Sequence, residues 1–174
     1  MKTLRMVSLH EMTSLDPNTR LSDSSAATPV LKLMCPNLVR LDATMRIQPD
    51  VAESWTCFDD GLRYRFKLRP GVRFHNGARL DARAVVWNFE RIFAPTSHSP
   101  LAEDLNLIRA VDAISDEIVQ VTLDRPFPAF LYHLAGRCHL VADTAMQPAG
   151  AGPYQVIEWR RGSHRKLARF QDYW

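Results

Sequence analysis

The clearest pattern in the chain is an unbroken alternation of apolar and basic residues from Leu62 to Arg69. Successive side chains of a β-strand point to opposite faces, so this alternation predicts a strand with one buried face. Its buried face would carry four apolar side chains, namely Leu62, Tyr64, Phe66 and Leu68. The basic residues between them would face water. The turn signal Asp59-Asp60-Gly61 comes directly before the strand and predicts a hairpin with residues 55–58.

The period of the pattern changes after residue 81 to that of a helix. Apolar residues then recur at spacings of three and four, which predicts a helix with one apolar face. These residues are Ala82, Val85, Val86, Phe89, Ile92 and Phe93. Asp81 is the expected N-cap, and Pro95 is expected to stop the helix.

The remaining elements are expected to be short. Further strands are predicted over residues 3–8, 108–114, 117–123, 154–159 and 166–170. The run Leu15-Asp16-Pro17-Asn18 predicts a turn. A short helix should begin at Thr28-Pro29 and end near Pro36, and another should follow residues 126–128 and close at Gly136.

Strands and short helices therefore mix without a regular β-α-β alternation. This order favours a mixed α+β fold whose sheet is mostly antiparallel, and it argues against a doubly wound parallel sheet.

Composition limits the class of protein more than its function. The chain has 174 residues, of which 46% are hydrophobic and 24% charged, and its net charge is +3. These values fit a globular chain of about one domain and exclude a disordered or collagen-like one. The basic run 160–166 lacks interleaved aromatic residues, so we expect a solvated hairpin and no nucleic-acid partner.

The sequence carries no motif of a common enzyme class. Nucleophile elbows, zinc-protease motifs, phosphate-binding glycine loops and dinucleotide fingerprints are all absent. Cys35, Cys57 and Cys138 are widely spaced, so we expect small buried side chains and neither a metal site nor a disulfide framework. His139 follows Cys138 directly, but neighbours on an extended chain point to opposite faces, which disfavours a nucleophile and base pair. No enzyme activity, metal or cofactor is expected.

The run Gly150-Ala151-Gly152-Pro153-Tyr154 stands just before a predicted strand. Its glycines would allow another stretch of backbone to approach closely.

Taken together, several segments resemble the family 5 extracellular solute-binding proteins, the peptide and nickel receptors of ABC importers. The resemblance follows the family's order along nearly the whole chain. It is carried by residues 49–55, 60–61, 64–77, 81–89, 119–123, 126–131, 150–154 and 172–174. The chain departs from the family where Ala151 replaces a usual Thr and where Ala84 replaces a usual Asp. The stretch between residues 137 and 148 also looks shortened.

The resemblance implies the first-lobe part of a type II periplasmic-binding-protein-like clamshell, which closes on its ligand. Residues 1–29 would begin lobe I, residues 30–148 would form an insert packed on it, and residues 149–174 would return to it. Members are much longer than this chain, so the opposing lobe would be missing and the chain would be a fragment. A single lobe cannot enclose a ligand, and we expect weak binding or none.

The implied function is the substrate-binding component of an importer for peptides or a related small solute such as a nickel chelate. Its partners would be that ligand and an inner-membrane ABC permease, and its location would be the periplasm. The first residues lack the features of a signal peptide, which would then have been removed or lie outside the sequence. Four candidate ligand-binding residues follow from the resemblance: Ser24, Ser25, Arg137 and His139.

One alternative keeps the same fold in a different class of protein. Some cytoplasmic transcriptional regulators resemble this family in their solute-sensing domain. The missing signal peptide would suit such a sensor, whereas the lack of a helix-turn-helix would not.

Overall fold

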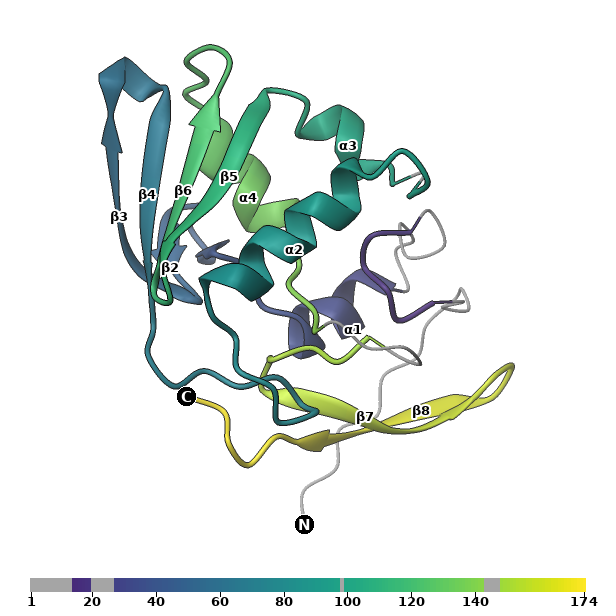
Figure 1. Cartoon of the computed structure of the whole chain (residues 1–174). Coiled ribbons are helices and arrows are strands. Elements are labelled where there is room, and N and C mark those ends of the chain that lie inside the picture. Colours follow the sequence, from purple (N-terminus) through teal and green to yellow (C-terminus); the bar gives the residue numbers. More distant parts are fainter. Residues whose placement is uncertain (1–13, 20–26, 98, 143–147) are drawn as a thin grey trace.

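The computed structural model describes residues 14–19, 27–97, 99–142 and 148–174 (Figure 1). Its largest element is a four-stranded antiparallel sheet in the order β3-β4-β6-β5. The strands are β3 (Ala52–Phe58), β4 (Arg63–Leu68), β5 (Ile108–Ser115) and β6 (Ile118–Leu123). The mixed α+β class with antiparallel pairing is therefore confirmed.

Strand β4 has the alternation that its sequence predicts. Tyr64, Phe66 and Leu68 are buried, and the basic residues between them are exposed. Phe66 lies opposite Trp55 on β3 and Val119 on β6, so it occupies the centre of the sheet. The predicted hairpin between β3 and β4 is confirmed, and the short 3-10 turn η2 (Asp59–Gly61) connects the two strands.

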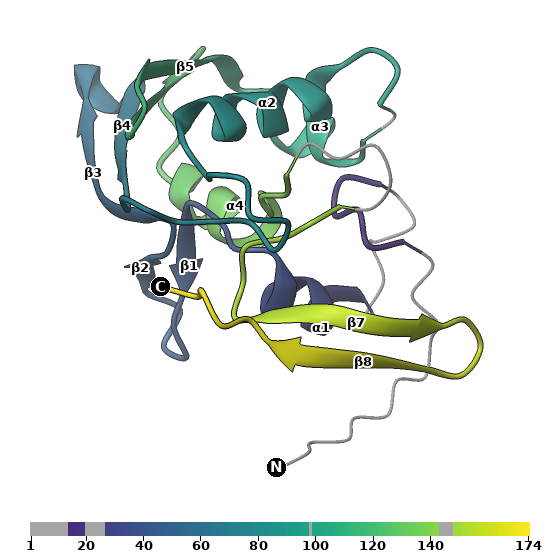
Figure 2. The same ribbon diagram turned by 60° about the horizontal axis from the view of Figure 1, so that its bottom comes forward.

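Two helices cover one face of this sheet. These are α2 (Ala82–Phe93) and α4 (Phe130–Arg137), and Figures 1 and 2 show both on the same side. The Asp81 side chain accepts a hydrogen bond from the Ala84 backbone N–H at 3.0 Å, which confirms the predicted N-cap. The prediction that α4 closes at Gly136 is wrong by one residue. The helical hydrogen bond from Cys138 N–H to the Leu134 carbonyl carries the helix past the glycine.

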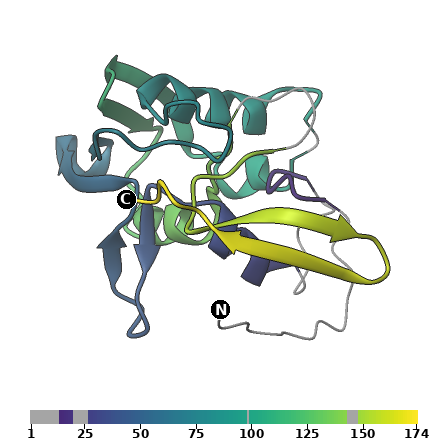
Figure 3. The same ribbon diagram turned by 90° about the horizontal axis from the view of Figure 1, so that it is seen from below.

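A second region packs around the ends of the described chain. It contains α1 (Ala27–Met34) and the hairpin of β7 (Tyr154–Arg160) and β8 (His164–Arg169), which lie side by side in Figures 2 and 3. Both were predicted. The small hairpin of β1 (Val39–Leu41) and β2 (Ile47–Pro49) was not. The predicted strand over residues 3–8 lies outside the described residues.

The described chain builds two apolar clusters. The main cluster lies between the sheet and the helices α2 and α4, and Phe66, Phe89 and Phe130 are almost fully buried in it. The second cluster is smaller and gathers the N-terminal turn, α1 and the β7–β8 hairpin. Its buried members are Leu15, Leu31, Met34, Cys35 and Val141.

The three cysteines do not share one environment. Cys35 and Cys138 are buried as expected, but Cys57 is exposed, which corrects the prediction for that residue. Cys57 lies near the end of β3, and this edge strand has a neighbouring strand on one side only.

Candidate functional site

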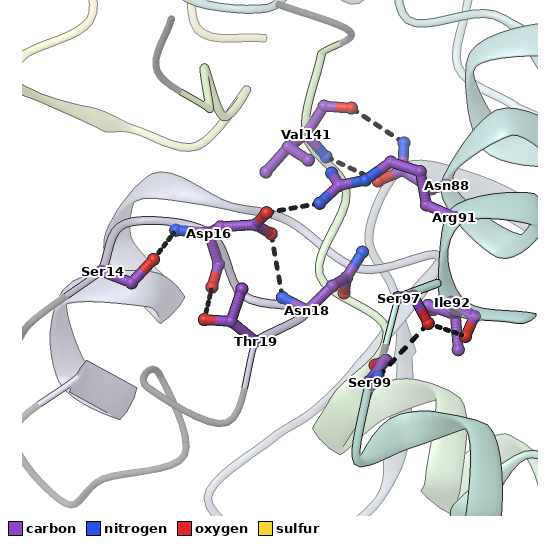
Figure 4. Close-up of polar contacts among 10 residues, drawn as sticks. All are labelled: Ser14, Asp16, Asn18, Thr19, Asn88, Arg91, Ile92, Ser97, Ser99 and Val141. Atoms are coloured by element: carbon purple, nitrogen blue, oxygen red, sulfur yellow. Dashed lines mark hydrogen bonds and ion pairs between the residues drawn. The ribbon is translucent and has the colours of Figure 1, made fainter. Parts of the chain in front are cut away.

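The predicted turn at the start of the described chain is held by a compact set of hydrogen bonds. Asp16 is at its centre: its Oδ1 atom accepts from the Asn18 backbone N–H at 3.0 Å, and its carbonyl oxygen accepts from the Thr19 hydroxyl (Figure 4). Its own backbone N–H donates to the Ser14 hydroxyl oxygen. An Asp side chain that bonds the backbone two residues later mimics a backbone turn and sets the chain direction here.

Helix α2 anchors the turn through its last residues. Arg91 forms an ion pair with the Oδ2 atom of Asp16, and Figure 4 shows this contact. The same guanidinium lies 4.9 Å from the centre of the Trp87 ring, one helical turn earlier. Arg91 is therefore held between a carboxylate and an aromatic face. The spacing of Trp87 and Arg91 on a helix was visible in the sequence, but the partner in the turn was not.

A cavity of about 300 Å³ opens between this turn and the end of α2. Its lining includes Asp16, Asn18, Arg91, Thr96 and Ser97. The site is therefore formed by two segments that lie more than seventy residues apart in the sequence.

Asn18 is the most unusual residue of this lining. It is 4% exposed, and neither the oxygen nor the nitrogen of its side-chain amide has a hydrogen-bond partner within the described part of the chain. Most buried polar groups in proteins have such a partner. Asn18 was part of the predicted turn, but nothing in the sequence indicated an unpaired amide.

The structure describes only part of the predicted ligand site. Ser24 and Ser25 lie outside the described residues. Arg137 is the last residue of α4, and its side chain is also outside what is described. His139 follows two residues later and is buried, with 8% of its surface exposed. Its Nδ1 atom lies 3.1 Å from the carbonyl oxygen of Cys35.

His139 is thus linked to the end of α1 and, through Cys35, to the vicinity of the turn. Burial is the main cause that lowers the pKa of His139 below its usual value. Burial also raises the pKa of the Cys35 thiol to about 12, and the Asp16 carboxylate adds to this shift. The charge of Asp16 therefore affects the Cys35 thiol, and His139 forms a hydrogen bond with the Cys35 carbonyl oxygen.

The segment that carries His139 is fixed by backbone and side-chain bonds. The amide of Asn88 on α2 donates to the Val141 carbonyl oxygen at 2.8 Å and accepts from the Val141 N–H at 3.1 Å. Leu140 N–H donates to the carbonyl oxygen of Pro36. Side chains alternate along this extended segment, so Leu140 faces the main cluster and Val141 the second one.

The same alternation separates Cys138 from His139, as the sequence predicted. Cys138 packs in the main cluster, while His139 contacts Cys35 of the second cluster. Burial raises the pKa of the Cys138 thiol to about 12. This arrangement does not form a nucleophile and base pair.

Two further observations concern the described residues alone. No three or more histidine, cysteine or acidic side chains come together there in a way that could hold a metal ion. Each helix in that part of the chain is too short or too polar to span a bilayer.

Comparisons with known proteins give the family. Residues 46–174 match the model of the bacterial extracellular solute-binding proteins, family 5. The glutathione-binding protein GsiB of Pectobacterium atrosepticum is 31% identical over 172 residues, which cover 93% of this chain and 33% of that protein. The chain thus spans about a third of the length of the curated relatives it matches.

Solved structures agree with this result. The binding protein AgaA of A. tumefaciens R10, solved with agropinic acid, superposes with a TM-score of 0.86 and 26% identity over 94% of this chain and 35% of that chain. DppA of Helicobacter pylori, solved with the peptide STSA, superposes with a TM-score of 0.82 and 26% identity. The superposition covers 93% of this chain and 38% of that chain. None of these names describes a DNA-binding regulator, so the sensor alternative gains no support.

The order of motifs, the mixed fold and the family match all lead to one assignment. The chain belongs to the family 5 bacterial extracellular solute-binding proteins.

Proposed function

We propose that this chain is the first-lobe portion of the solute-binding component of an ABC importer for peptides or a related small solute, such as a nickel chelate. The observation that carries this proposal is the superposition on AgaA, which covers 94% of this chain but only 35% of that binding protein. GsiB, which binds glutathione, and DppA, which was solved with the peptide STSA, support a peptide-like solute.

In the proposed receptor, residues 1–29 and 149–174 belong to lobe I and residues 30–148 form an insert on it. The two apolar clusters divide the described chain at other points, because Leu31, Met34, Cys35 and Val141 of the second cluster lie within residues 30–148. Ligand binding would shift an equilibrium between open and closed states through contacts that exist only in the closed state. The closed receptor would dock on an inner-membrane permease from the periplasm.

The proposed ligand contacts come from the end of α4 and from the loop after the N-terminal turn. Arg137 would hold a ligand carboxylate through two charge-assisted hydrogen bonds. His139, Ser24 and Ser25 would border the same pocket. The position of Arg137 supports its role, because it ends α4 just before the segment that Asn88 fixes. We propose no catalytic step for any of these residues.

Isothermal titration calorimetry tests the one-lobe proposal. The 174-residue chain is titrated with glutathione and with the peptide Ser-Thr-Ser-Ala, beside a chimera in which it replaces the matching third of GsiB from Escherichia coli (strain K12). We expect binding by the chimera and none by the chain alone, since one lobe leaves the ligand exposed to water. Micromolar binding by the chain alone would contradict the proposal, as would a folded chimera that binds neither ligand.

The role of Arg137 is tested in the same chimera. Arg137→Ala should weaken the binding of a ligand with a free carboxylate by about 1.5–3 kcal/mol, the usual value of hydrogen bonds to a charged group. Arg125→Ala, which changes an arginine in the connection between β6 and α4, is the matched control and should leave the affinity unchanged. An equal effect of both variants would remove Arg137 from the site.

A further inference from the structure

The excess positive charge of the chain is concentrated in the β7–β8 hairpin. Residues 154–169 contain five arginine or lysine side chains and one acidic side chain, so the net charge of the hairpin is +4. The whole chain has 22 basic and 19 acidic residues. Without the hairpin these numbers become 17 and 18, and the rest of the chain has a net charge of −1. The basic residues of the hairpin are Arg160, Arg161, Arg165, Lys166 and Arg169.

The hairpin presents these cations to water. Its tip extends beyond α1 in Figures 1 and 3. The turn at the tip is closed by the Ser163 N–H, which donates to the Arg160 carbonyl oxygen at 3.1 Å. Four of the five basic residues are exposed, and Arg165 is half-buried. The side chains that anchor the hairpin to the second cluster are Val156, Trp159 and Leu167.

One carboxylate serves several of these cations. Arg160 and Lys166 both form ion pairs with Glu158, the single acidic residue of the hairpin. Arg161 lies over the ring of Trp159, with 5.4 Å between the guanidinium carbon and the ring centre. Cations therefore outnumber anions on this surface, and their charge is suited to an anionic partner from outside the chain.

Strand β4 is also basic, but its charges are balanced locally. Arg63 pairs with Asp59 at 3.0 Å, and Lys67 pairs with Glu53 at 2.6 Å. Each of these two cations thus has a carboxylate of its own. The basic face of β4 is therefore a matched control for the hairpin, because its cations are exposed in the same way.

The hairpin exposes apolar surface beside its charges. Ile157 lies at an irregularity in the pairing of β7 with β8, and 61% of its surface is exposed. Tyr154 at the start of β7 is 40% exposed. Protein segments that lie on the surface of an anionic bilayer combine basic side chains with apolar and aromatic ones.

We propose that the β7–β8 hairpin docks on the surface of a bilayer that contains anionic phospholipids. Its arginine and lysine side chains donate hydrogen bonds to the headgroup phosphates, and Ile157 contacts the apolar layer below them. The surface potential of a bilayer attracts each cation without requiring a matched geometry, which suits cations spread along two strands and a turn. This inference goes beyond the proposed transport function and needs no solute.

Co-sedimentation of the 174-residue chain with lipid vesicles tests the proposal. Vesicles of phosphatidylglycerol and phosphatidylcholine in equal parts should bind the chain roughly tenfold or more tightly than vesicles of phosphatidylcholine alone. High salt should abolish the difference, because it screens the charges. Equal binding to both kinds of vesicle, or no binding to either, would overturn the proposal.

A pair of double variants locates the binding surface. Arg160→Gln with Arg161→Gln should weaken binding to the anionic vesicles roughly thirtyfold. Arg63→Gln with Arg65→Gln removes the same charge from exposed positions on β4 and should leave the affinity nearly unchanged. Equal losses in the two variants would show that net charge alone matters and would overturn the assignment to the hairpin. If the hairpin variant does not fold, the comparison of the two kinds of vesicle with the unmodified chain still decides.

Two further measurements distinguish a bilayer from an acidic protein. Ile157→Ser removes an exposed apolar side chain and should weaken vesicle binding roughly fivefold. Poly-glutamate offers negative charge without an apolar layer, so at the same charge concentration it should bind the chain more weakly than the vesicles do. Equal binding to poly-glutamate and to the vesicles would favour an acidic protein and overturn the proposal. An Ile157→Ser variant that binds vesicles as tightly as the unmodified chain would overturn the apolar contact.

Discussion

At the scale of single residues, two glycines before β7 lie very close to the backbone of α1. A Cβ atom added to Gly150 would lie 1.9 Å from the Met34 carbonyl oxygen, and one added to Gly152 would lie 2.4 Å from the Leu33 oxygen. The sequence predicted this close approach of backbone from the glycines alone. It could not predict that α1 would be the partner.

Gly150→Ala should therefore destabilise the fold by about 3 kcal/mol, the upper part of the usual range for overpacking. The clash is with backbone, which cannot move aside like a flexible side chain. Gly71→Ala is the control, because a Cβ there meets open space and the cost comes from its φ of 74° alone, about 1 kcal/mol. Urea unfolding measures both variants. Equal losses would show that the contact at Gly150 relaxes without cost.

The pH dependence of stability should report the burial of His139. Burial lowers its pKa in the folded chain below the value of 6.5 for a free side chain. Below about pH 6.5 the unfolded chain therefore binds more protons than the folded chain, and the free energy of unfolding decreases as the pH falls. His139→Asn places an amide near the Nδ1 position but does not titrate, so it should reduce this decrease. Unfolding curves between pH 7 and 5 test this, and identical slopes for both proteins would contradict it.

The sequence could not show which residues far apart in the chain contact each other. The turn at Asp16 was predicted because Asp, Pro and Asn act on their own backbone. Its ion pair with Arg91 depends on how the turn packs against α2, and no local pattern encodes that contact. Asn18 and its cavity follow from the same packing, so they were missed for the same reason.

At the scale of elements, strongly periodic segments were predicted well. Strand β4 and helix α2 each have an apolar face with a regular period and a clear signal at one end. The β1–β2 hairpin was missed because each of its strands has only three residues, too few for a pattern. Its turn is held instead by Asp42, which accepts hydrogen bonds from the backbone N–H groups of Thr44 and Arg46.

The N-cap of α2 provides a test at this scale. Asp81→Ala should lower the stability by about 1 kcal/mol, because it leaves the Ala84 N–H of the first turn without its side-chain acceptor. Asp81→Ser keeps an acceptor at the same position and should recover most of the loss. Chemical unfolding of both variants gives the answer. If serine costs as much as alanine, the carboxylate charge matters more than the capping bond.

At the scale of the whole molecule, one polar side chain joins the two apolar clusters. Asn88 is 2% exposed and lies on α2 between buried apolar residues. Its amide holds both backbone groups of Val141, which belongs to the second cluster. The sequence pattern identified the apolar face of α2 but gave no reason to place a buried asparagine in it.

Asn88→Ala should destabilise the chain by about 2–4 kcal/mol, because the N–H and carbonyl groups of Val141 would be buried without partners. Asn106→Ala, at an exposed position, should have almost no effect. Thermal unfolding of Asn88→Ala, followed by circular dichroism and by tryptophan fluorescence, also tests the coupling between the clusters. A loss as small as that of the control would show that water replaces both bonds.

The backbone contact between Pro36 and Leu140 has a consequence for how this architecture can vary. The chain leaves the α1 region at Pro36 and comes back at Leu140, whose N–H donates to the Pro36 carbonyl oxygen at 2.8 Å. The hundred or so residues between these points thus form a loop with adjoining ends. A change of length within this loop leaves its two ends side by side, whereas an exchange of the whole loop between homologues must also preserve the contacts of Arg91 with Asp16 and of Asn88 with Val141.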